Sequence, residues 1–74
     1  MAKLRVLSGR EVCQILAQHG YEEIRKRGSH IVMQIKTENS TITIPIPNHK
    51  EIRTGALMSI IRQSRLDRTI FETD

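Results

Sequence analysis

The chain contains very little cysteine: Cys13 is the only one among its 74 residues. A single cysteine excludes an internal disulfide and any metal site built from paired cysteines. The three histidines, His19, His30 and His49, are not spaced as metal ligands either, so neither a metal nor another cofactor is expected. We interpret Cys13 as a small buried thiol on a helix.

Aromatic residues and long apolar runs are also scarce. One tyrosine, one phenylalanine and no tryptophan argue against a sheet that binds nucleic acid by stacking bases on aromatic side chains. No apolar run approaches the roughly 20 residues of a membrane span, and no hydrophobic leader follows Met1. The expected location is therefore the cytoplasm.

The length is enough for one domain, which we take to span residues 1–74. A chain of this size buries only about 60–65% of its unfolded surface, so an active site should lie on the surface and a partner protein could add stability. Twelve basic and eight acidic side chains give a net charge of +4, and residues 25–37 hold four basic side chains and no acidic one. A polyanion such as a nucleic acid is the favoured partner.

A first amphipathic helix is predicted over residues 8–19. Ser8 and Glu11 have the spacing of a capping box, and Gly20 follows where helices commonly end. Its apolar stripe consists of Val12, Ile15, Leu16 and His19, which places His19 as a half-buried side chain.

A second helix is predicted over about residues 55–65, with Thr54 as its cap. A further turn capped by Asp67 is expected after it. Residues 1–7 are interpreted as a basic lead-in, and the last residues are expected to fray.

Three strands are predicted between the helices. Residues 31–35 and 42–46 alternate apolar and polar side chains, with turn residues between them, which indicates an antiparallel hairpin. Residues 21–27 fit an edge strand. The order α-β-β-β-α favours an α+β two-layer sandwich, with both helices on one face of a three-stranded antiparallel sheet and the other face open.

Strand parity makes His30 a candidate catalytic residue. Ile31, Met33 and Ile35 should face the helices, so His30 should face the open side, near the basic run 25–27 and the Gly-Ser pair that could form a bulge. A histidine beside cations suits metal-independent RNA cleavage, in which the 2′-hydroxyl is the nucleophile. An ordinary surface histidine fits the same pattern.

His49 and several cations are further candidate site residues. His49 could help in proton transfer, or it could simply bond the backbone of its loop. The candidate RNA-binding residues are the basic run, the turn after it and three further cations: Arg25, Lys26, Arg27, Gly28, Ser29, Lys36, Lys50 and Arg53.

Five segments of the chain match a known pattern in order: residues 7–11, 19–21, 27–30, 44–52 and 55–63. Through them the chain, over residues 7–66, resembles the HicA family of toxin mRNA interferases, which have a double-stranded-RNA-binding-domain-like fold. One departure is Ala56, where the family commonly has threonine.

The resemblance implies a toxin that cleaves mRNA, with His30 of the Gly-Ser-His motif as the catalytic residue. It also implies a HicB-type antitoxin as the partner that covers the active surface. The alternatives are a non-catalytic RNA-binding module of the same fold and a pure protein-interaction domain.

Overall fold

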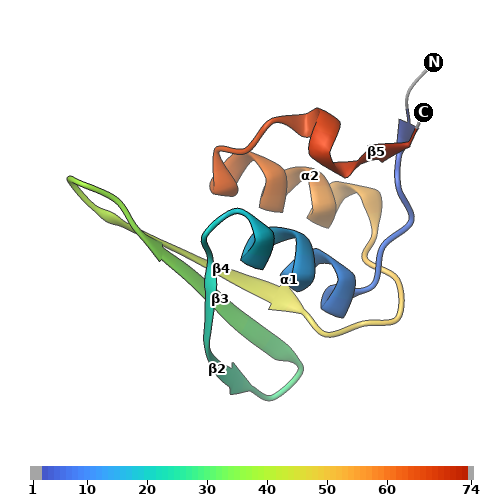
Figure 1. Cartoon of the computed structure of the whole chain (residues 1–74). Helices are drawn as coiled ribbons and strands as arrows, with labels where there is room; N and C mark the ends of the chain where they lie inside the picture. The colour runs from blue at the N-terminus through green and yellow to red at the C-terminus, as the bar shows by residue number, and fades with distance from the viewer. Residues whose placement is uncertain (1–2, 74) are drawn as a thin grey trace.

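The computed structural model describes residues 3–73 and has the predicted order of elements, with a short strand added at each end (Figure 1). The elements are β1 (Lys3–Leu4), α1 (Gly9–Gln18), β2 (Glu22–Arg27), β3 (His30–Lys36), β4 (Thr41–Pro47), α2 (Thr54–Ser64), the 3-10 helix η1 (Arg68–Phe71) and β5 (Glu72–Thr73).

Helix α1 begins at the predicted capping box. The Glu11 amide donates to Ser8 Oγ (3.1 Å), and the Ser8 amide donates to the Glu11 carboxylate (2.9 Å). These hydrogen bonds lower the pKa of Glu11 because they favour its charged form. The helix ends before Gly20, whose φ of +97° lies in the left-handed region that glycine favours.

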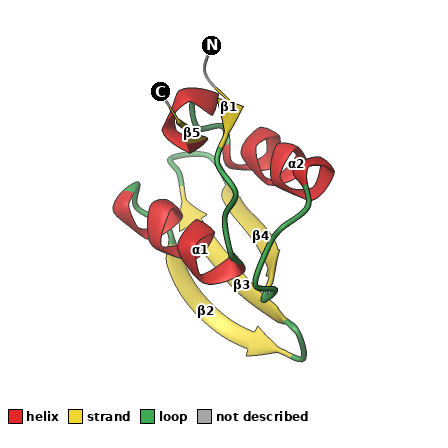
Figure 2. Ribbon diagram, turned by 90° about the vertical axis from the view of Figure 1, so that its right-hand side faces the viewer, coloured by secondary structure: helices red, strands yellow, loops and turns green. Residues whose placement is uncertain are grey.

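Strands β2, β3 and β4 form an antiparallel sheet in the order β2-β3-β4. Both helices pack on one face of this sheet (Figure 2), and its other face is open to solvent. The predicted two-layer α+β sandwich is therefore confirmed. β4 is an edge strand, in agreement with Pro45 and Pro47, which have no amide proton to donate to a further strand.

The core lies between the helices and the sheet. Its largest fully buried side chains come from every layer: Phe71, Leu7, Leu16, Ile31, Met33, Ile44, Ile46, Leu57 and Val12. The Tyr21 hydroxyl donates to the Ser64 carbonyl (3.0 Å) and thereby joins the segment after α1 to the end of α2. Burial raises the pKa of this tyrosine.

The start of α2 differs from the prediction. Thr54 is the first helical residue and not its cap, and Arg53 occupies the cap position without a side-chain hydrogen bond. The predicted turn after α2 is confirmed as η1, where the Asp67 carboxylate accepts from the Thr69 amide (2.9 Å).

The prediction of a lead-in and a fraying end was wrong where the structure describes these segments. β1 pairs antiparallel with β5, with Lys3 opposite Thr73 and Leu4 opposite Glu72. The Arg5 amide also donates to the carbonyl of the fully buried Phe71 (2.8 Å). These bonds hold the two ends of the described chain side by side (Figures 1 and 2).

His19 is exposed, and so the prediction of a half-buried side chain was wrong. It is the C-cap residue of α1, where φ of −111° and ψ of 24° depart from the helix, and its Nδ1 is 2.9 Å from the Ile15 carbonyl oxygen. None of the helices within residues 3–73 combines the length and apolar character needed to cross a bilayer.

Cys13 is buried as predicted, and burial raises the pKa of its thiol to about 11. At pH 8 the folded protein should therefore react only slowly with a disulfide reagent such as Ellman's reagent, because the thiolate is the reactive form. Reaction of the urea-unfolded protein should be fast. The absorbance of the released thionitrobenzoate measures the rate of both reactions. Immediate stoichiometric reaction of the native protein at pH 8 would contradict the burial.

Candidate functional site

His30 begins β3 directly after a two-residue turn. Arg27 of β2 pairs with His30, so Gly28 and Ser29 make the whole connection between the two strands. Gly28 has a φ of +59°, as the first position of a type II′ hairpin turn requires. The suggested bulge is therefore absent from this turn. The irregularity lies in β2 between Glu23 and Arg25.

The open face of the sheet carries His30 and two arginines. Ile31 and Met33 are 1% exposed on the helix side, whereas His30 is exposed on the other side. In the register of β2, Arg27 lies opposite His30 and Arg25 opposite Val32, so both arginines share its face. Lys26 of the same run lies opposite Ile31 and belongs to the other face.

The segment after β4 is fixed on the other side of His30. Pro47 lies opposite His30, and the Asn48 amide donates to the Ser29 carbonyl (2.7 Å). The Gly9 amide at the start of α1 donates to the His49 carbonyl (2.9 Å). Position 9 must lack a side chain here, because a Cβ atom would overlap the Pro47 carbonyl oxygen.

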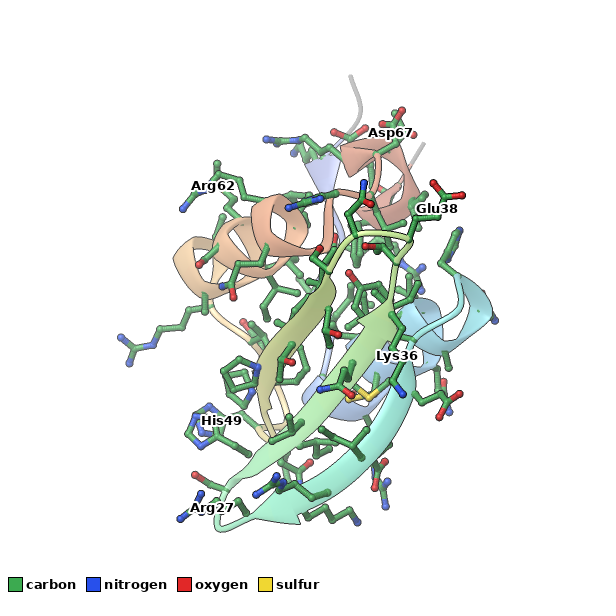
Figure 3. All side chains as sticks on the ribbon, turned by 90° about the vertical axis from the view of Figure 1, so that its left-hand side faces the viewer. Arg27, Lys36, Glu38, His49, Arg62 and Asp67 are labelled. Carbon is green, nitrogen blue, oxygen red and sulfur yellow. The ribbon has the colours of Figure 1, made fainter. Side chains whose placement is uncertain are left out.

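The turn 28–29 and the residues that follow β4 lie together at one end of the sheet, and we call this region the corner. A shallow hollow of about 290 Å³ adjoins the corner. It is lined by Pro47, His49, Glu51, Ile52, Arg53 and Ala56. Figure 3 shows Arg27 and His49 at the same end of the sheet. β2, β3 and the loop before α2 therefore all contribute exposed side chains to this end of the sheet.

The charged groups at the corner have no partners among residues 3–73. The one ion pair of this part of the chain joins Arg68 to Glu72 (2.7 Å), away from β2. Neither the His30 nor the His49 imidazole makes a hydrogen bond within the described residues. No group of three or more His, Cys, Asp or Glu side chains suited to a metal lies within the same range.

The structure brings together only some of the candidate residues. Arg25, Arg27, His30, His49 and Arg53 gather around the corner or its hollow. Lys36 shares their face but lies six residues along β3, about 20 Å away at ~3.3 Å per residue. Lys50 is exposed in the loop before α2.

Sequence reasoning missed one residue of the corner, Gly9. Its position as the first residue of α1 could be read from the capping box, but its hydrogen bond to the His49 carbonyl joins residues 40 positions apart. The sequence pattern carries no signal for that contact.

The comparison with protein families decides the identity of the chain. Residues 9–66 match the family model described as the HicA toxin of bacterial toxin–antitoxin systems, a range that includes the whole corner. The chain belongs to the HicA toxin family. It is thus the toxin of a toxin–antitoxin pair, and an antitoxin is its partner. No curated protein and no solved structure matches this HicA chain significantly.

Proposed function

We propose that this HicA protein is an endoribonuclease that cleaves mRNA with His30 as a proton-transfer residue. The observation that carries the proposal is the position of His30: it is exposed, its imidazole makes no hydrogen bond to the described residues, and Arg27 lies beside it on the open face of the sheet. An imidazole in this setting is accessible to a phosphodiester and has its ring nitrogens available for proton transfer.

The chemistry uses the nucleophile that RNA itself provides. The 2′-oxygen attacks the adjacent phosphorus while its proton is removed, and the bond to the 5′-oxygen breaks as that oxygen gains a proton. The products are a 2′,3′-cyclic phosphate and a 5′-hydroxyl. The protein needs only proton-transfer groups and cations that stabilise the charge of the phosphorane, so the reaction requires no metal.

Arg25 and Arg27 are the phosphate contacts best placed to assist His30. Both lie on its face, and neither has a carboxylate partner within residues 3–73. We propose that Gly28, Ser29, Lys50 and Arg53 extend the RNA-binding surface beyond these arginines, and that Lys36 contacts RNA further along the open face. Lys26, which faces the other side of β2, would contribute from the edge of the sheet. The antitoxin, of the HicB type, is proposed to cover this same surface.

A pair of matched oligonucleotides tests the reaction. We expect the purified protein to cleave single-stranded RNA in the presence of EDTA and to release a fragment ending in a cyclic phosphate, detected by mass spectrometry. The same RNA with a single 2′-deoxynucleotide at the cleaved position should stay intact there, because it lacks the nucleophile.

Two results would count against this reaction. Loss of cleavage on adding EDTA would exclude the metal-independent mechanism. Intact RNA with saturable binding that weakens as salt rises would instead support the non-catalytic RNA-binding module.

A further inference from the structure

The chain stays against the turn 28–29 for one residue after β4 has ended. The hydrogen bond from the Asn48 amide to the Ser29 carbonyl (2.7 Å) keeps Asn48 paired although β4 ends at Pro47. Pro47 lies opposite His30, so His49 is placed two residues beyond the partner of His30. Figure 3 shows His49 at the end of the sheet where Arg27, the other cross-strand neighbour of His30, also lies.

The backbone of His49 is held while its side chain is left free. Its carbonyl accepts from the Gly9 amide (2.9 Å), and the Ile52 amide donates to the Leu7 carbonyl (2.8 Å). The imidazole is exposed, lines the hollow beside the corner, and makes no hydrogen bond within residues 3–73. The His49 imidazole therefore does not bond the backbone of its own loop.

We propose that His49 is the second proton-transfer residue of the reaction, a role that rests on the proposed function of His30. One imidazole, neutral, takes the 2′-hydroxyl proton as the 2′-oxygen bonds to phosphorus. The other, protonated, gives its proton to the 5′-oxygen as the bond from phosphorus to that oxygen breaks. A single phosphodiester seated between the two side chains satisfies both transfers, with Arg27 beside it.

The pH dependence of cleavage tests this role. The wild-type rate should rise and fall with pH, because it needs one neutral and one protonated imidazole. His49→Ala should fold normally, since only its backbone is bonded, and should lose on the order of 10²–10⁴-fold in kcat/KM. It should also lose one limb of the pH profile, and His30→Ala should lose the other.

A substrate with sulfur in place of the bridging 5′-oxygen then assigns the two roles, because a thiolate departs without being protonated. Exactly one of the two variants should regain a rate close to that of the wild type on this substrate. An undiminished rate for His49→Ala, a reduced rate that keeps both limbs, or rescue of both or neither variant would overturn the role of His49. If the wild-type protein does not cleave RNA at all, the proposed function itself fails.

Discussion

Replacing His30 by alanine should slow RNA cleavage by orders of magnitude and leave the fold intact. The side chain is exposed and bonded to nothing among the described residues, so its removal costs little stability. The loss of one proton-transfer group should lower the cleavage rate on the order of 10²–10⁴-fold. Cleavage of a labelled RNA by the purified variant measures the rate, and circular dichroism during heating measures the fold.

His19→Ala is the matched control for this variant. It removes the same side chain from an exposed position at the end of α1, outside the corner, and it should keep full activity. Induced in cells without the antitoxin, the wild type and the His19 variant should arrest growth, and the His30 variant should not. Undiminished cleavage by His30→Ala would remove this histidine from the mechanism.

A second large effect is expected from Gly9→Ala, although alanine is normally the better helix former. A Cβ atom at this position would overlap the Pro47 carbonyl oxygen and approach the Asn48 backbone. Neither neighbour is the end of a flexible side chain, so α1 and the segment after β4 must move apart. We expect a loss of about 1–3 kcal/mol in the free energy of unfolding, measured in urea.

Cleavage should fall as well in this variant, because the displaced segment carries His49 and pairs with Ser29 beside His30. Gly55→Ala is the control: this glycine also lies in the first turn of a helix, and nothing is within 4 Å of its added Cβ. It should raise stability by about 0.4–1 kcal/mol. Equal stability changes in the two variants would show that Gly9 is not held closely against the segment.

Most of the fold could be predicted from residue patterns that act over short distances. The capping box of Ser8 and Glu11 fixes the start of α1, and the alternation along residues 31–35 and 42–46 fixes which side of the sheet is buried. That alternation also placed His30 on the open face, so its exposure follows from the sequence. Its catalytic role remains a prediction.

The features that could not be predicted depend on distant parts of the chain or on where an element stops. β1 and β5 are two residues long, too short to show any period, and they pair across nearly the whole chain. His19 continues the apolar stripe of α1 in the sequence, but it is the C-cap residue, whose backbone has already left the helical conformation. Threonine is a residue type that often caps helices, but Thr54 is already helical, and the extended cap residue is Arg53.

The pairing of β1 with β5 makes this chain suitable for circular permutation. Lys3 and Thr73 are cross-strand neighbours, so a short glycine linker could join the two ends without distorting either strand. New ends could be opened in the exposed turn between β3 and β4, at Glu38 and Asn39. This turn follows Lys36, which lies some 20 Å along the strand from His30 at ~3.3 Å per residue. An antitoxin domain fused at that turn would be tethered to the face that it is proposed to cover, so toxin and inhibitor could be produced as one molecule.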